Sequence, residues 1–142
     1  MKQSGSVDQA FDFFNCENID ALVQSTIRQK LERCIQESGF TFIESVFHKF
    51  KGFGEGYSFL AIIGESHVAI HTWPEKGAAE ITLHYCDFSR NNGEKAEELI
   101  KLYKEIFRPA RISAYKTRIR CVVEPIQTTW NKKRQTMKKS LA

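Results

Sequence analysis

The chain has 142 residues, of which 42% are hydrophobic and 27% are charged. This composition is typical of one globular domain and argues against a chain that is disordered throughout. No apolar run approaches the ~18–20 residues needed to cross a bilayer, and the first residues lack the basic and apolar regions of a signal peptide. We therefore expect a cytoplasmic protein that does not associate with membranes.

The formal net charge is +4, and basic residues gather in segment 132–139 near the end of the chain. A basic tail can bind nucleic acid through phosphate contacts, but it is more often a solvated terminus. We therefore divide the chain into one domain of residues 1–123 and a basic tail of residues 124–142. We do not expect nucleic acid to be its ligand.

The first half of the chain predicts a short aromatic-rich strand, one helix and two further strands. The strands are expected at 10–15, 41–47 and 57–63, where β-branched and aromatic residues concentrate. From 19 to 38 apolar residues recur with helical spacing, which predicts one amphipathic helix that ends at Gly39.

The second half predicts four more strands and a second helix. The strands are marked by β-branched or alternating apolar residues and cover 68–72, 79–86, 111–115 and 118–123. Pro74 ends the first of these strands. The helix is expected over 93–107, with an apolar face and a stop at Pro109.

This order of elements predicts an α+β fold, a two-layer sandwich whose mostly antiparallel sheet carries helices on one face. The strand 79–86 alternates cleanly, with apolar residues at the odd positions and Cys86 on its polar face. We expect apolar residues such as Phe59 and Ala61 to lie on the other face of the sheet. A second copy would then cover that face, in a homodimer or a higher oligomer.

The four cysteines form no C-x-x-C pair, which favours neither a zinc site nor a disulfide scaffold. We expect free thiols that are mostly buried as small hydrophobic side chains, with Cys86 as the exception; the others are Cys16, Cys34 and Cys121.

The most informative stretch is 64–75, with the sequence GESHVAIHTWPE. His67 and His71 could share one face of a strand, but the glutamate of H-E-x-x-H and a third ligand are missing, so we expect no metal. Ser66 lacks the second glycine of a nucleophile elbow, which argues against a serine hydrolase.

Together with Cys86, this stretch resembles the prokaryotic S-adenosylmethionine decarboxylase family, and the similarity extends from about Phe11 to Val123. The resemblance implies that Ser66 attacks the carbonyl of Glu65 and that the chain cleaves itself there. The products would be a β chain, residues 1–65, and an α chain, residues 66–142. The α chain would begin with a pyruvoyl group made from Ser66, which would form a Schiff base with the substrate amine.

The resemblance also assigns roles to single residues. Ser58 would support the oxyanion during processing, and His71 would be the base for β-elimination, a task that suits imidazole. Cys86 would be the proton donor to the decarboxylated product. Glu75 would hold the ribose hydroxyls of the substrate, and Phe50 would stack on adenine.

Three alternatives remain open from the sequence. Phe53 competes with Phe50 for the adenine, because the loop 51–56 is longer than is usual in the family. Asp87, where the family usually has glycine, or Glu55 could bind a cationic side chain of a substrate. A pyruvoyl-dependent arginine or ornithine decarboxylase is therefore an alternative to a decarboxylase that acts on S-adenosylmethionine for spermidine biosynthesis. A non-catalytic basic binding module is the more distant alternative.

Overall fold

The computed structural model describes residues 5–52, 54–86 and 92–121, with the side chains of 116–121 outside this description. The elements in chain order are β1 (Gly5–Cys16), α1 (Asp20–Val23), α2 (Ile27–Glu37), β2 (Phe42–Lys49), β3 (Tyr57–Ile63), β4 (Ser66–Trp73), the short 3-10 helix η1 (Pro74–Lys76), β5 (Ala78–Cys86), α3 (Asn92–Phe107) and β6 (Pro109–Cys121). None of the helices in this part of the chain combines the length and the apolar character that a membrane span requires.

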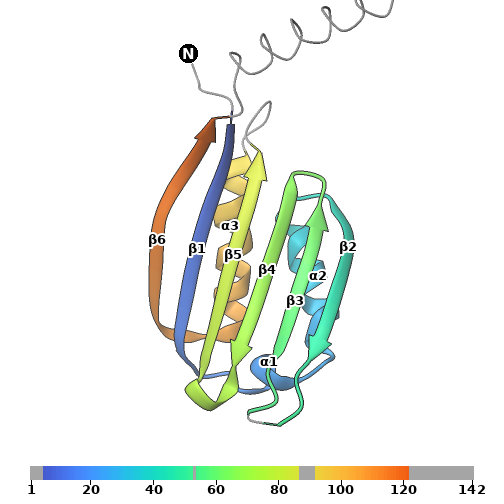
Figure 1. The fold of residues 1–142 in the computed structure, drawn as a ribbon, viewed down its shortest axis with the longest axis vertical. Helices are drawn as coiled ribbons and strands as arrows, with labels where there is room; N and C mark the ends of the chain where they lie inside the picture. The colour runs from blue at the N-terminus through green and yellow to red at the C-terminus, as the bar shows by residue number, and fades with distance from the viewer. Residues whose placement is uncertain (1–4, 53, 87–91, 122–142) are drawn as a thin grey trace, which may run out of the picture.

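The strands form one six-stranded sheet in the order β2-β3-β4-β5-β1-β6. Every pair of neighbours is antiparallel. The helices α2 and α3 lie side by side on one face of this sheet and leave the other face open (Figure 1). The predicted α+β sandwich of two layers is therefore confirmed.

The helix predicted over 19–38 is two helices, α1 and α2, because Gln24 is extended, with φ −79° and ψ 132°. Buried side chains from the sheet occupy the backbone carbonyls that a continuous helix would use. The Tyr57 hydroxyl donates to the carbonyl of Ala21 at 2.7 Å, and the Thr72 hydroxyl donates to that of Leu22 at 2.8 Å. Tertiary contacts therefore override the local helical pattern.

The edge of the sheet differs from the prediction in length. The two strands expected at 111–115 and 118–123 are one strand, β6, which is paired with β1 through a register shift between Asp8 and Ala10. β1 is longer than the predicted 10–15 because it lies between β5 and β6 and forms ladder bonds on both sides. The tail from 124 lies outside the described residues.

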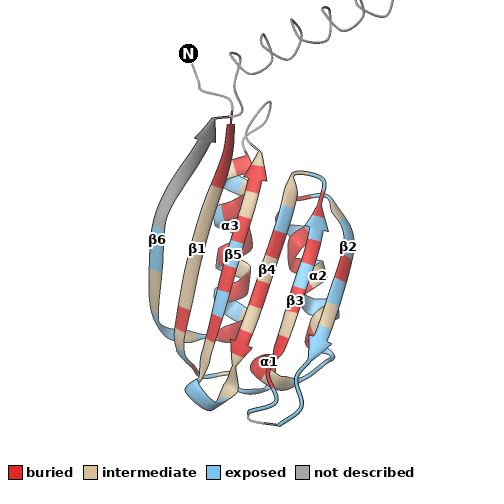
Figure 2. Ribbon diagram, viewed as in Figure 1, coloured by how far each residue is buried: buried red, intermediate tan, exposed pale blue. Residues whose placement is uncertain are grey.

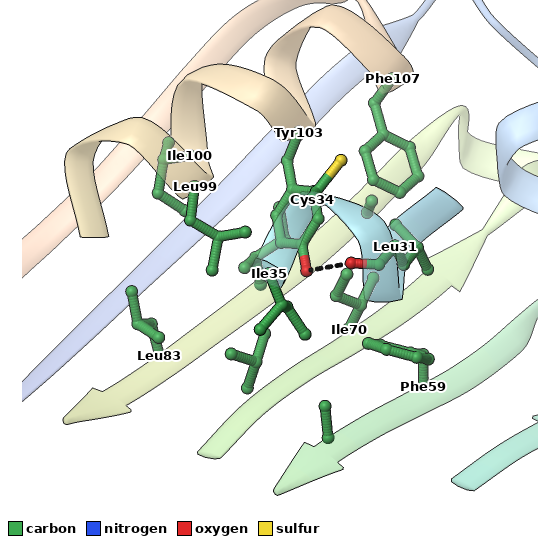
Figure 3. Close-up of a cluster of buried hydrophobic side chains, with 14 of the residues drawn as sticks. Leu31, Cys34, Ile35, Phe59, Ile70, Leu83, Leu99, Ile100, Tyr103 and Phe107 are labelled. Carbon is green, nitrogen blue, oxygen red and sulfur yellow. Dashed lines mark hydrogen bonds between the residues drawn. The ribbon is translucent and has the colours of Figure 1, made fainter. Parts of the chain in front are cut away.

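The hydrophobic core fills the space between the helices and the sheet. Alternating burial along the central strands marks the face that packs on the helices (Figure 2). Side chains of α2 and α3 meet those of β3, β4 and β5 there, and the Tyr103 hydroxyl donates to the carbonyl of Leu31 at 3.4 Å (Figure 3). Cys16 and Cys34 are buried as expected, and burial raises the pKa of each thiol to about 11.

The open face carries an apolar patch on β2 and β3, but its residues are not the expected ones. Phe59 and Ala61 lie under the helices, with exposed fractions of 0% and 2%. Strand residues alternate between faces, so the open face of β3 carries Leu60 and Ile62 instead, exposed by 49% and 56%. Val46 lies opposite Leu60 on β2 and is 64% exposed.

Candidate active site

The predicted cleavage point lies in the tight turn between β3 and β4. Gly64 and Glu65 form the turn, and Ser66 is the first residue of β4. The φ of Ser66 is +153°, a value that residues with a side chain rarely adopt. Such backbone strain costs on the order of 1–3 kcal/mol and persists only where surrounding contacts fix it.

The carbonyl of Glu65 is held by the end of β5. Its oxygen accepts the backbone N–H of Cys86 at 2.9 Å. The carbonyl of Cys86 in turn accepts the side-chain amide of Asn92, at the start of α3, at 2.5 Å. A backbone donor is therefore aimed at the oxygen that would carry negative charge if Ser66 attacked this carbonyl.

This donor was missed by sequence reasoning, which assigned Cys86 a role through its thiol alone. The antiparallel pairing of 66–73 with 78–86 could have indicated this donor. That register places Ser66 opposite Tyr85, so the following residue, Cys86, lies at the turn that contains Glu65.

The side chain of Glu65 is also anchored. Its carboxylate accepts the backbone N–H and the hydroxyl of Thr41, both at 3.1 Å, and Lys95 Nζ lies 3.9 Å away. The N–H of Gly64 donates to the carbonyl of Thr41 at 2.7 Å. These contacts, from Thr41 just before β2 and from Lys95 in α3, fix both ends of the peptide that leads into Ser66.

The other predicted residues gather at the opposite end of β4. The Ser58 hydroxyl and Nδ1 of His71 lie 2.7 Å apart, on paired positions of β3 and β4. They line a pocket of about 410 Å³, whose walls are Phe50, Lys51, Gly56, Ser58, His71, Thr72, Trp73 and Glu75. The structure thus brings together four of the predicted residues, Phe50, Ser58, His71 and Glu75. Phe53 lies outside the described residues.

Two features shape this pocket. The Thr72 hydroxyl accepts the N–H of Tyr57 at 2.9 Å and so fixes the end of β4 beneath the pocket. The loop before β3 packs closely on Glu75, since a Cβ added to Gly54, with φ +70°, would lie 2.1 Å from Oε2 of that side chain. Glycine therefore allows the loop to back the carboxylate directly.

The two groups of residues are far apart in one chain. His71 follows Ser66 by five positions on β4, which corresponds to about 17 Å at the rise of an extended strand. Ser66 and Cys86 lie at one end of the sheet, and Ser58 and His71 lie toward the other end. A single chain does not bring these four predicted residues together.

A further cluster lies beside Ser66 on the open face. Nδ1 of His67 lies 3.2 Å from the Ser66 hydroxyl. The ring of His67 stacks on that of His84, with centroids 5.2 Å apart and planes 13° apart, and Nδ1 of His84 hydrogen-bonds to Asp8. Burial, and then the charge of His84, lower the pKa of His67. From the sequence, His67 was considered only as a metal ligand beside His71, a role that was not expected, and so this cluster was missed. Among the described residues, no group of acidic, histidine and cysteine residues is arranged to hold a metal.

Comparison with known proteins gives a consistent result. A family model described as S-adenosylmethionine decarboxylase matches residues 9–119. A protein of Thermotoga maritima named S-adenosylmethionine decarboxylase proenzyme is 36% identical over 93 residues, which are 66% of this chain and 70% of the relative. A protein of Archaeoglobus fulgidus with the same name is 30% identical over 92 residues, 65% of this chain and 77% of the relative.

The fold also has a counterpart among solved structures. The adenosylmethionine decarboxylase of Aquifex aeolicus superimposes with a TM-score of 0.72 over 86% of this chain and 95% of its own, at 22% identity. The structural match shows a shared fold, and the family model covers the stretch that contains Ser66, His71 and Cys86. The chain belongs to the S-adenosylmethionine decarboxylase family.

Proposed function

We propose that this chain cuts itself between Glu65 and Ser66 and then decarboxylates S-adenosylmethionine, which supplies an aminopropyl donor for spermidine biosynthesis. The observation that carries this proposal is the geometry of the turn. The Glu65 carbonyl accepts the N–H of Cys86 at 2.9 Å, directly beside a serine in strained backbone. Both features favour attack by the serine, since one stabilises the oxyanion and the other destabilises the uncut peptide.

The proposed cleavage has two stages. The hydroxyl of Ser66 attacks the carbonyl carbon of Glu65 through a five-membered ring and converts the amide into an ester. A base then removes the proton from the α-carbon of Ser66. The main-chain acyl group of Glu65 leaves by β-elimination as the new C-terminal carboxylate of the β chain. Water converts the remaining dehydroalanine into a pyruvoyl group and releases ammonia.

The distance between the two groups of residues supports a site shared between two copies. His71, the proposed base for elimination, lies about 17 Å from Ser66 along its own strand. A second copy packed on the open face, with its β4 running in the opposite direction, would bring its Ser58 and His71 to the first copy's Ser66. The exposed side chains of Leu60 and Ile62 would be covered by such a dimer.

The residues present fit a pyruvoyl group formed at position 66. When formed, this group supplies a ketone that binds an amine and accepts the electrons released as carbon dioxide leaves. Cys86 lies at the end of β5 opposite Ser6, and its N–H bonds to the Glu65 carbonyl. This closeness to the cut supports its proposed role as the proton donor to the product. Glu75 and Phe50 line the pocket, as expected for groups that bind ribose and adenine.

The comparisons favour S-adenosylmethionine over a basic amino acid. The two relatives described above carry the name of that enzyme, and each is at least 30% identical. Glu55, which could bind a cationic side chain, does not line the pocket that contains Glu75. Asp87 lies outside the described residues. Arginine and ornithine therefore enter the test as competing substrates.

The test combines intact-mass measurement with a decarboxylation assay. Purified protein should give two pieces that separate between Glu65 and Ser66, and the larger should be lighter than a serine-led fragment by the mass of one ammonia. It should release carbon dioxide from S-adenosylmethionine faster than from arginine or ornithine. Cleaved protein that prefers ornithine would reject the substrate, and uncut protein with an ordinary Ser66 would reject the whole proposal.

A further inference from the structure

The first stage of the proposed cleavage needs a base beside Ser66. Its hydroxyl must lose a proton as the oxygen attacks the carbonyl of Glu65. His67 meets the geometric requirement, because its Nδ1 lies 3.2 Å from that oxygen in the same chain. His71 does not meet it in the same chain, since it lies about 17 Å away along β4.

We propose that His67 is the base that takes the Ser66 hydroxyl proton as the acyl group of Glu65 moves from nitrogen to oxygen. This inference rests on the proposed self-cleavage. The O–H bond of Ser66 breaks, its proton passes to Nδ1 of His67, and Oγ bonds to the carbonyl carbon of Glu65. The oxyanion accepts the N–H of Cys86. The C–N bond then breaks, and the departing amine takes the proton back from His67, which leaves an ester and a free amine.

The surroundings of His67 keep its imidazole neutral, as a base requires. Burial, and then the charge of His84, lower its pKa below the ordinary value of 6.5, while the charge of Asp8 opposes this shift. On the other side, its register partner on β3 is the apolar Ile62, beyond which Glu44 lies on β2. Near neutral pH the ring is therefore free to accept a proton.

His84 and Asp8 act as positioning residues. The carboxylate of Asp8 accepts the Nδ1–H of His84 and so fixes the plane of its ring. The ring of His67 stacks on this plane, at an angle of 13°. The stack holds Nδ1 of His67 toward Ser66 across three strands of the open face, β4, β5 and β1.

The experiment separates the two stages of cleavage with hydroxylamine, which cuts the ester but not the amide. In the His71→Ala variant the elimination is blocked, so the ester should accumulate and hydroxylamine should release the 1–65 fragment. When His67→Asn, which can form a hydrogen bond but cannot take a proton, is added to His71→Ala, the ester should form at least about 100-fold more slowly than in His71→Ala alone. Freshly synthesised precursor of each variant is followed by gel and by mass, with circular dichroism as the check on folding.

A measurement that leaves residue 67 unchanged covers the case in which His67→Asn fails to fold. The rate of ester formation in His71→Ala should fall on acidification, with a midpoint below the ordinary histidine value of 6.5. Adding Asp8→Asn should shift this midpoint to lower pH, because the charge of Asp8 raises the pKa of His67. A purely structural role for Asp8 would not produce that shift.

Two results would overturn the role of His67. One is a folded His67→Asn protein that forms the ester at the rate of its parent. The other is a rate of ester formation that is constant across roughly pH 5 to 8. Failure of the proposed function looks different, because the unaltered chain would then show neither ester nor cleavage.

Discussion

Substitution of Gly54 by alanine should move the carboxylate of Glu75 without breaking the fold. The new Cβ would lie 2.1 Å from Oε2 of Glu75, and that atom is at the end of a flexible side chain, so the carboxylate must turn away. The positive φ of Gly54 adds on the order of 1–2 kcal/mol of strain. Gly52→Ala is the matched control, because its φ is also positive and its Cβ would meet nothing within 4 Å.

The expected effect is on substrate binding. A hydrogen bond to a charged group contributes about 1.5–3 kcal/mol, and each 1.4 kcal/mol is a factor of about ten in affinity. Loss of the proposed bond between Glu75 and the ribose should therefore raise KM for S-adenosylmethionine roughly 10- to 100-fold in Gly54→Ala. Self-cleavage should proceed normally in both variants, since the atoms nearest to a Cβ at Gly54 belong to Glu75 rather than to Ser58 or His71, and a Cβ at Gly52 meets nothing within 4 Å.

The assay compares steady-state KM and kcat of the two variants after complete cleavage, with urea unfolding as the measure of stability. The reasoning is wrong if Gly54→Ala and Gly52→Ala have the same KM. It is also wrong if Gly54→Ala loses kcat alone, because Glu75 would then act on the chemical step rather than on binding.

Three other changes test separate parts of the account. Cys86→Ala keeps the backbone N–H at the Glu65 carbonyl, so mass spectrometry should show normal cleavage. Turnover should fall at least tenfold, and an uncut protein would mean that the thiol itself acts in processing. Thr72→Val leaves two buried backbone groups without a partner and should lower the free energy of unfolding in urea by about 2–4 kcal/mol, whereas the exposed Thr82→Val should change it by less than about 0.5 kcal/mol. Co-expression of Ser66→Ala with His71→Ala should restore cleavage of the His71→Ala chain if two copies share the site, and no cleaved chain in a proven mixed dimer would exclude that arrangement.

The parts of the fold set by local pattern could be predicted from the sequence. The alternation of 79–86 and the helical spacing over 93–107 are confirmed by β5 and α3. The break between α1 and α2 could not be predicted, because Tyr57 and Thr72 come from strands far along the chain. Phe59 and Ala61 were placed on the wrong face because composition indicates an apolar strand but not which side packs on the helices.

For the candidate site, the residue types could be predicted from the sequence, but their arrangement in space could not. The motif identified Ser66, His71 and Cys86 as residue types suited to the chemistry, but their distances depend on strand register. That register separates Ser66 from His71, aims the N–H of Cys86 at Glu65, and stacks His67 on His84. His67 and Asp8 are far apart in the sequence and meet only through β5, so no local pattern could have revealed their cluster.

The most direct test of the central claim is the intact mass of the unaltered protein beside that of Ser66→Ala. We expect two chains from the unaltered protein, the second bearing a ketone that borohydride reduces, and one uncut, folded chain from the variant. An active protein that remains a single polypeptide with an unmodified Ser66 would contradict this claim.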